Sequence, residues 1–194
     1  MPGADEGHTA GVSVLVEGRS DRLALEALAR RRGDSLVDAE IVVMDGITNL
    51  RGRLIALKGS RMRVLGLYDG AERAYVERVL VTFGVADPEA AGFFGCDRDL
   101  EDEVIRAAGP DLVLDTLGRR GELARFRRFQ RQPAQRVRSM QEQLHRFAGT
   151  AAGRKSRFAA DVIEVMPMER MPVPLTALLD RAVAEDRGVW LSGG

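Results

Sequence analysis

Acidic side chains recur along the first hundred residues, each shortly after a short apolar run. They are Glu17, Asp45, Asp69, Asp97 and Asp99. If the apolar runs are parallel strands, their carboxyl ends meet at one edge of a sheet and the acids converge there. Clustered carboxylates repel one another, and divalent cations relieve that repulsion; a ligand set made only of oxygen atoms suits Mg²⁺ or Mn²⁺. The pattern therefore predicts a site for one or two such ions.

The same acids also have a structural interpretation as helix caps. Asp21, Glu72 and Asp99 stand near the expected starts of helices, where free N–H groups and the helix dipole stabilise a carboxylate. Capping accounts for any one of them. It does not require an acid after every strand, so the metal site is favoured for the set as a whole.

Glu101 is the strongest candidate in the acidic stretch 98–103. On a helical wheel for residues 100–108, Leu100 marks the buried face and Glu101 lies at its border, whereas Asp102 points nearly opposite. An inward-facing glutamate is costly unless it is paired or bound to a metal. We therefore expect Glu101 to belong to the site, and Asp102 and Glu103 to be solvated.

Lys155 is one of only two lysines, with Lys58, in a chain that uses arginine for its other cations. It lies on the apolar stripe that Phe158 and Val162 define. A lysine on this face indicates a point charge directed at a phosphate. The alternative is a side chain that reaches water from the first turn of its helix.

Charge is unevenly distributed although the net charge is zero. Residues 87–116 hold nine acids and two bases, and residues 119–158 hold twelve bases and two acids. The basic half predicts a nucleic-acid-binding surface, and the alternative is that the two halves pair with each other or face solvent. The arginines expected to bind nucleic acid are Arg119, Arg120, Arg125, Arg127, Arg128, Arg154 and Arg157.

The elements that must position these residues alternate between strand and helix. Apolar runs predict buried strands at 12–16, 40–44, 63–68 and 92–95, and helical periodicity predicts helices at 21–32, 48–58, 72–83 and 100–108. This order predicts an α/β fold with a mainly parallel four-stranded sheet flanked by helices. Beyond Pro110 only helices are predicted, at 112–117, 123–131, 140–147, 155–166 and 175–185.

These elements suggest an α/β core over residues 11–118. A helical extension over 119–186 would carry the basic residues and Lys155, with mobile tails at 1–10 and 187–194. Composition is typical of a globular protein, with 45% hydrophobic and 30% charged residues. No apolar stretch reaches membrane-spanning length, the start does not resemble a signal peptide, and the lone Cys96 excludes an internal disulfide. We expect a cytoplasmic protein with no membrane partner.

Four motifs together resemble the TOPRIM domain, in the version found in the OLD (overcoming lysogenization defect) family of endonucleases. They are "VLVEGRSD", "VLGLYDGAE", "RDLEDEVI" and "GRKSRFA", in the order of the family and spanning about residues 11–166. The resemblance implies a TOPRIM/Rossmann-like fold with a C-terminal helical extension. It also implies hydrolysis of DNA phosphodiesters, by nicking or endonucleolytic cleavage.

The resemblance also implies a role for each matching residue. Glu17 would bind metal and act as the acid–base residue, Asp21 would bind the second ion and Asp69 the first. Glu101 would complete the acidic cluster, and Lys155 would stabilise charge on the scissile phosphate. Two bound ions would activate water and steady the leaving oxygen.

Two departures from the family pattern keep alternatives open. The usual aspartate motif has a second Asp where this chain has Ala71, so Glu72 and Asp99 are considered as further ligands. The GxxxxGK[ST] nucleotide loop of the long family members is not found in this sequence, which allows a free-standing nuclease, a subunit working with a separate ATPase, or a degenerate relative. The alternatives to a nuclease are a non-catalytic nucleic-acid- or nucleotide-binding module and a nucleotidyl or phosphoryl transferase.

Overall fold

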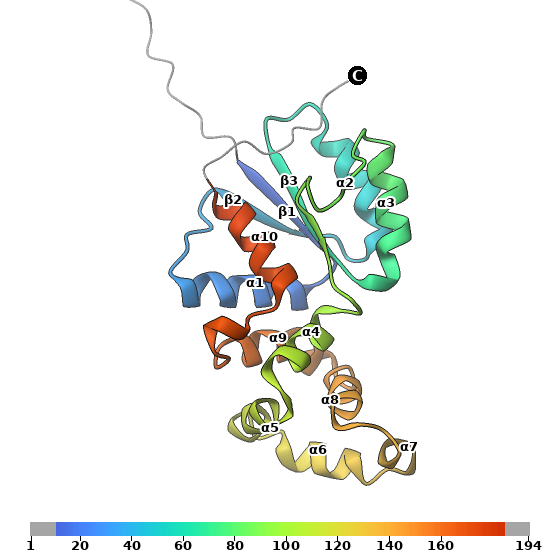
Figure 1. Ribbon diagram of the computed structural model, residues 1–194, viewed down its shortest axis with the longest axis vertical. Coiled ribbons are helices and arrows are strands. Elements are labelled where there is room, and N and C mark those ends of the chain that lie inside the picture. The colour runs from blue at the N-terminus through green and yellow to red at the C-terminus, as the bar shows by residue number, and fades with distance from the viewer. Residues whose placement is uncertain (1–10, 185–194) are drawn as a thin grey trace, which may run out of the picture.

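A fully parallel sheet organises the first half of the chain. The computed structural model describes residues 11–184, and within them four strands lie in the order β2-β1-β3-β4 (Figure 1). The strands are β1 (Val12–Val16), β2 (Ala39–Val43), β3 (Arg63–Tyr68) and β4 (Phe93–Gly95). This confirms the predicted α/β fold, with strand bounds within one residue of those expected. Because the chain leaves β1 toward β2 and later returns to its other side, a ligand crevice is expected between the carboxyl ends of β1 and β3.

Helices cover both faces of the sheet and continue beyond it (Figure 1). The helices of the described range are α1 (Arg19–Arg32), α2 (Leu50–Leu57), α3 (Arg73–Val81), α4 (Leu100–Ala108), α5 (Pro110–Arg119), α6 (Leu123–Gln130), α7 (Pro133–Arg136), α8 (Met140–Ala148), α9 (Ala152–Ile163) and α10 (Val173–Val183). Short 3₁₀ turns are η1 (Ile47–Asn49), η2 (Gly70–Glu72) and η3 (Met168–Arg170). None of the described helices is both long enough and apolar enough to cross a membrane.

The two faces of β1 feed two separate cores because successive side chains of a strand point to opposite sides. Val14 and Val16 pack with α1, α4, α9 and α10 in the larger core, whereas Leu15 packs with α2 and α3 in the smaller one. All five residues of β1 are buried, as expected for an inner strand covered on both faces. Glu17, the next residue, therefore emerges directly from the core.

The C-terminal helices do not lie in one place. Helices α5–α8 extend away from the sheet, whereas α9 packs along α1 and α10 returns to cover β3 and β4 (Figure 1). Arg31 of α1 donates to the Ile163 carbonyl at 2.7 Å and so ties α9 to the sheet layer. The segment 119–186, predicted as one extension, thus supplies two helices to the α/β layer, while the tails 1–10 and 187–194 lie outside the described residues.

Helix starts differ most from the prediction. Helix α1 begins at Arg19, two residues early, because the extended Gly18 precedes it and donates its N–H to the Asp21 carboxylate at 2.9 Å. Helix α9 begins at Ala152 and ends at Ile163, so Lys155 stands in its first turn. The four-residue helix α7 was not predicted; Pro133 at its first position suits a helix start.

Candidate metal centre at the carboxyl edge of the sheet

A cleft of about 220 Å³ opens where β1 and β3 end. Its lining residues are Glu17, Gly18, Ser20, Asp21, Asp69, Asp99, Glu101, His145, Gly149 and Lys155. The register of the sheet explains part of this set: Leu15 pairs with Gly66, so the residues that follow β1 and β3 reach the same edge. Glu17 and Asp69 from the strand ends, Glu101 from α4 and Lys155 from α9 share this one cleft.

The turn from β1 into α1 holds two of the acids in different ways. Asp21 accepts the N–H of Gly18, whereas Oε2 of Glu17 is buried with no hydrogen-bond partner among the described residues. Ser20, between them, donates its hydroxyl to Oε1 of Glu101 at 2.6 Å and so links α1 to α4. A buried carboxylate oxygen without a partner is costly, and it marks Glu17 as the group most in need of a ligand.

Gly70 allows Asp69 to approach the turn between β4 and α4. A Cβ atom at Gly70 would lie 2.0 Å from the carbonyl oxygen of Asp97, and the Gly70 N–H donates to the carbonyl of Arg98 at 2.8 Å. The glycine of the "DG" pair is therefore required for close packing. It brings the turn that carries Asp99 beside Asp69.

Burial and mutual repulsion raise the pKa values of three carboxylates of the cleft, Glu17, Asp21 and Asp69. Burial, and then the charges of Glu101 and Glu17, raise the pKa of Asp21 to about 7. Burial, and then the charges of Asp21 and Glu17, raise the pKa of Asp69 to about 7. The pKa of Glu17 is also raised, by burial and by Glu72, and Lys155 opposes that shift. The positive charge of Lys155 thus does not outweigh the burial and mutual repulsion of these three acids.

Asp99 stands apart from the other acids because both of its oxygens are engaged. One accepts the N–H of Asp102 at 2.8 Å as the cap of α4, and the other lies 2.6 Å from Nε2 of His145 on α8. Burial alone would raise the pKa of Asp99, but these hydrogen bonds outweigh it and the pKa is lowered. These contacts favour a role for Asp99 in joining α4 to α8.

Two cleft residues were missed from the sequence. Ser20 belongs to the "EGRSD" turn, so its position beside Glu17 was a usable signal. His145 had none, because only the packing of α8 against α4 brings it to the cleft. Glu72 does not line the cleft, although its charge acts on Glu17. Its neighbour Ala71, where the family pattern has an Asp, is exposed.

Asp45 and Asp97 do not join the other acids. Asp45 follows β2, which lies on the far side of β1 from β3, and it faces a separate hollow with Arg19 and Arg22. Asp97 is exposed and pairs with Arg106 at 2.9 Å. The expectation that every strand-end acid converges is therefore wrong for these two, because strand order and the β4–α4 turn direct them elsewhere.

The expectation that Glu103 is solvated is also wrong. Its side chain is buried, accepts the N–H of Asp97 at 2.8 Å and pairs with Arg106 at 2.6 Å. A helical wheel shows which side chains face inward but not that the preceding turn folds back over the helix. Glu103 thus fixes the turn that leads to Asp99.

The acids of the cleft have the donor atoms that a divalent cation prefers, but their side chains are not arranged around a common point. As the side chains stand, no three His, Cys, Asp or Glu residues in the described part of the chain form a group that could hold a metal ion. Yet Glu17, Asp21, Asp69 and Glu101 supply only oxygen donors, the type that Mg²⁺ and Mn²⁺ prefer. The unpartnered Oε2 of Glu17 and the raised pKa values of Asp21 and Asp69 are features that a bound cation would stabilise.

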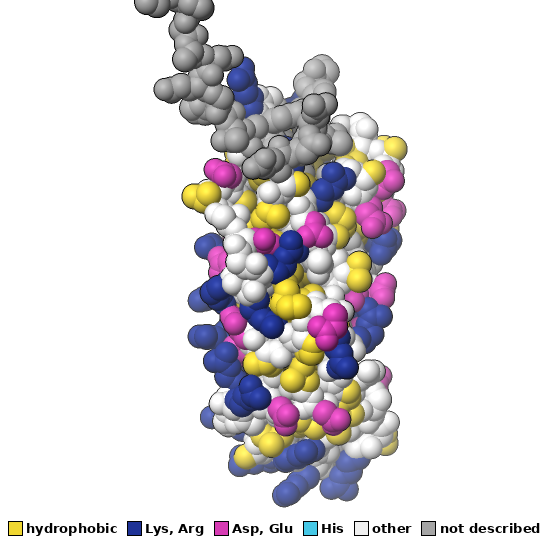
Figure 2. Space-filling view, turned by 60° about the vertical axis from the view of Figure 1, so that its left-hand side comes forward, with side chains coloured by type: hydrophobic (Ala, Val, Ile, Leu, Met, Phe, Trp, Pro, Cys, Tyr) yellow, Lys and Arg dark blue, Asp and Glu magenta, His cyan; other side chains and the backbone are white. Residues whose placement is uncertain are grey.

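The arginines expected to bind nucleic acid divide into two groups. Figure 2 shows Lys and Arg side chains gathered at the end of the molecule away from the sheet, where α5–α7 lie. Four of these seven arginines are exposed and form no ion pair with any described residue: Arg119, Arg127, Arg128 and Arg157. Ion-paired arginines are Arg120 with Asp161 at 2.5 Å, Arg125 with Glu122 at 2.5 Å and Arg154 with Glu122 at 2.5 Å.

Arg154 is the arginine least suited to contact DNA. Its side chain is 12% exposed, and its guanidinium lies 3.8 Å from the centre of the Phe147 ring while it pairs with Glu122. These contacts bridge α6, α8 and α9. We therefore leave Arg154 out of the candidate DNA-binding set.

Comparison with known proteins shows the class of fold. No protein-family model matches the chain, and no curated protein matches it in sequence. Solved structures do match: the sheet order and surrounding helices are those of a TOPRIM-like α/β fold. The C-terminal region of the Burkholderia pseudomallei OLD protein superposes with a TM-score of 0.64 and 19% identity, covering 89% of this chain and 96% of that one.

A second OLD protein gives the same result. The C-terminal region of the Xanthomonas campestris pv. campestris OLD protein matches with a TM-score of 0.60 and 21% identity, over 89% of this chain and 94% of that one. The fold of this chain is therefore that of the C-terminal region of OLD proteins. At these identities the likeness concerns the fold, which agrees with the resemblance predicted from the four motifs.

Proposed function

We propose that the protein hydrolyses DNA phosphodiester bonds with the help of one or two divalent metal ions. The observation that carries this proposal is the convergence of Glu17, Asp21, Asp69, Glu101 and Lys155 in one cleft at the carboxyl edge of the sheet. Four carboxylates can bind divalent metal ions and one ammonium group can neutralise a phosphate, which suits metal-assisted phosphodiester cleavage. The fold shared with OLD proteins supports the same class of reaction.

The acids would hold the metal, and a different contact orients the side chain of each. Glu17 brings an oxygen with no other partner, Asp21 is oriented by the N–H of Gly18, and Glu101 by the hydroxyl of Ser20. Asp69 is held at the tight approach of Gly70 to the β4–α4 turn. When bound, Mg²⁺ or Mn²⁺ supplies positive charge that lowers the pKa of water and neutralises charge on the phosphate.

Glu17 and Lys155 would act on the reacting groups themselves. The pKa of Glu17 is raised by burial, which suits a group that accepts and returns a proton. Lys155 is exposed in the first turn of α9 yet lines the cleft, so its ammonium can meet a phosphate that enters from solvent. Stabilising charge on that phosphate in the transition state is its proposed role.

DNA would reach the cleft across the basic end of the molecule. Arg119 of α5, Arg127 and Arg128 of α6 and Arg157 of α9 are exposed, form no ion pair with any described residue and can neutralise backbone phosphates. They would fix the position of the DNA without reading its sequence.

A second candidate function is nucleic-acid binding without hydrolysis. Two observations favour it: Ala71 replaces an acid of the family pattern, and the described side chains do not form a ready group of metal ligands. In this case the cleft would be a remnant of a nuclease site, and the basic end would still bind DNA.

A plasmid-nicking assay separates the two functions. We expect supercoiled DNA to be nicked with Mg²⁺ or Mn²⁺ and to stay intact with EDTA. Glu17→Gln removes one charge at nearly constant volume and should lower the rate by about 10²–10³-fold or more. Glu40→Gln, the same exchange at an exposed position of β2, is the matched control and should cleave normally. Equal activity of the wild type and Glu17→Gln would sink the proposal, and DNA binding without any cleavage would establish the second function.

A further inference from the structure

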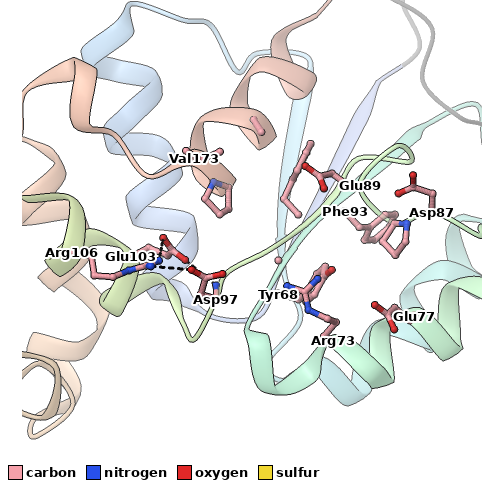
Figure 3. Close-up of a pocket in the computed structure, with 15 residues that line it drawn as sticks. Tyr68, Arg73, Glu77, Asp87, Glu89, Phe93, Asp97, Glu103, Arg106 and Val173 are labelled. Atoms are coloured by element: carbon pink, nitrogen blue, oxygen red, sulfur yellow. Dashed lines mark hydrogen bonds and ion pairs between the residues drawn. The ribbon is translucent and has the colours of Figure 1, made fainter. Parts of the chain in front are cut away.

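A larger hollow than the metal cleft lies beside β4, at the edge of the sheet. It has a volume of about 470 Å³, within the range of natural ligand pockets. Figure 3 shows its walls: Glu77 from α3, Glu89 from the loop before β4, Arg106 from α4 and Val173 from the start of α10. None of its lining residues is part of the metal cleft.

One side of β4 is not covered by another strand. Gly66 of β3 donates to Gly92, and Cys96 donates to Tyr68, so residues 92, 94 and 96 face β3. In a parallel ladder the peptide groups of the intervening residues, Phe93 and Gly95, point the other way, and the N–H of Phe93 donates to the carbonyl of Pro88 at 2.8 Å. The N–H and C=O of Gly95 have no backbone partner among the described residues. An edge of this kind is a template for another strand.

Tyr68 is a buried residue whose hydroxyl reaches the same hollow. Its side chain is only 5% exposed and lines the hollow, and the hydroxyl makes no hydrogen bond with any described residue. The ring lies against Gly95: a Cβ atom there would be 3.0 Å from the Tyr68 oxygen. The hydroxyl therefore stands beside the free peptide groups of β4 and is available to a ligand at that edge.

The charges around the hollow favour a cationic ligand. Glu77, Asp87 and Glu89 line it and form no ion pair with any described residue. Asp97 and Glu103 on the opposite wall already share Arg106. The remaining cation, Arg73, lies over the Tyr68 ring with its guanidinium carbon 5.9 Å from the ring centre. Three unpaired acids against one unpaired base leave the hollow acidic.

We propose that this hollow docks an extended, basic segment of a protein partner, which adds as a further strand beside β4. Its backbone would pair with Gly95, a Lys or Arg would meet Glu77 and Glu89, and an apolar residue would cover Val173, which is 77% exposed. Strand addition of this type combines backbone hydrogen bonds for affinity with side-chain pockets for specificity. The proposal does not depend on hydrolysis at the metal cleft.

Binding of peptide panels to the full chain tests the proposal. The probes are fluorescent heptapeptides in which Lys or Arg alternates with apolar residues, measured by anisotropy in 0.15 M salt. We expect at least one to bind and to shift and protect the Gly95 amide in NMR spectra. Glu77→Gln with Glu89→Gln should raise the Kd about tenfold, roughly 1.4 kcal/mol. Tyr68→Phe, which removes only the hydroxyl, should raise it roughly twofold to tenfold.

Matched controls exclude general charge effects. Asp111→Asn with Glu169→Gln also removes two exposed carboxylates, away from the hollow, and should leave the Kd unchanged. Peptides N-methylated at alternate residues keep their charge but cannot pair as strands, so they should not bind. Equal weakening by both double variants, equal binding of the N-methylated peptides or of spermine, or no binder in the panel at millimolar concentration would each overturn the proposal.

Discussion

The acidic cleft and the basic end of the molecule carry opposite charge, and they hold it in opposite ways. In the cleft, carboxylates are partly or fully buried, and Oε2 of Glu17 has no hydrogen-bond partner within residues 11–184. At the basic end, arginines are either exposed to water or tied in ion pairs such as Arg125 with Glu122. Unpaired charge in the cleft destabilises the folded chain, whereas exposed arginines cost the fold almost nothing.

This contrast indicates what each region is built to bind. A cleft that holds unpaired carboxylates at the expense of stability is matched to a small, concentrated cation. A surface of exposed arginines is matched to a long polyanion that touches several of them weakly. Single substitutions in the cleft should therefore have large effects, and single substitutions at the basic end small ones.

Replacing Lys155 in the cleft should change the nicking rate far more than replacing Lys58 outside it. We expect Lys155→Met to lower the nicking rate by about 10²–10³-fold, because it removes a charge from the transition state. Lys58→Met, at the exposed end of α2, is the matched control and should leave the rate unchanged. Metal-induced thermal stabilisation should survive both changes. Equal rates for the two variants would remove Lys155 from the proposed mechanism.

The salt dependence of DNA binding should show how many arginines contact phosphates of the DNA backbone. If only the four unpaired arginines contact phosphates, affinity should fall about 10²-fold between 50 and 200 mM salt, whereas seven contacts would give about 10⁴-fold. Glutamine at Arg119, Arg127, Arg128 and Arg157 together should flatten the dependence. A slope near the value for seven contacts would mean that the ion pairs open on binding.

The cost of charge in the cleft should appear in the pH dependence of stability. The pKa of Asp21 is raised to about 7 in the folded chain, against about 4 when unfolded. The folded state therefore binds the extra proton between these values, so this group's contribution to stability is lost as pH rises from about 4 to 7. Asp21→Asn should raise the Tm at pH 8 by about 4–8 °C, roughly 2 kcal/mol, and by little at pH 4.

A bound metal ion should offset the loss of stability that the charged carboxylates of the cleft cause. Adding Mn²⁺ should raise the Tm of the wild type more at pH 8 than at pH 5.5, since protons compete for the carboxylates. The Asp21→Asn variant should gain less. Equal gains at both pH values, or in both proteins, would place metal binding outside the cleft.

The smallest expected effects distinguish Arg154, which has a structural role, from the exposed arginines. Arg154→Met should lower the Tm by about 2–4 °C, roughly 1 kcal/mol, because it breaks the bridge to Glu122 and the stack on Phe147. It should not alter the salt dependence of DNA binding. Arg127→Met should do the reverse, with an unchanged Tm and a slightly flatter salt dependence. A reversed outcome would return Arg154 to the DNA-binding set.

Most of the cleft could be predicted because its main residues follow elements with strong local patterns. Glu17 and Asp69 come directly after buried strands, and a parallel sheet places such residues at one edge. Glu101 was found from the periodicity of a single helix. Asp45 was misplaced because no local pattern reveals the order of the strands. His145 was missed because it reaches Asp99 across 46 residues of chain.

The sequence by itself determined where strands and helices form, which acids follow the strands and which half of the chain is basic, since these depend on neighbouring residues. Only the tertiary structure decided which of those groups meet. In it, Oε2 of Glu17 finds no hydrogen-bond partner among the described residues, Glu103 is buried and Arg154 pairs with Glu122. One edge of β4 has no neighbouring strand in the described part of the chain. The physical reason is that desolvation and pairing depend on surroundings supplied by distant segments. Charges of the same type thus came to lie in a candidate metal site, a helix cap, an ion pair or a solvated surface according to what packed against them.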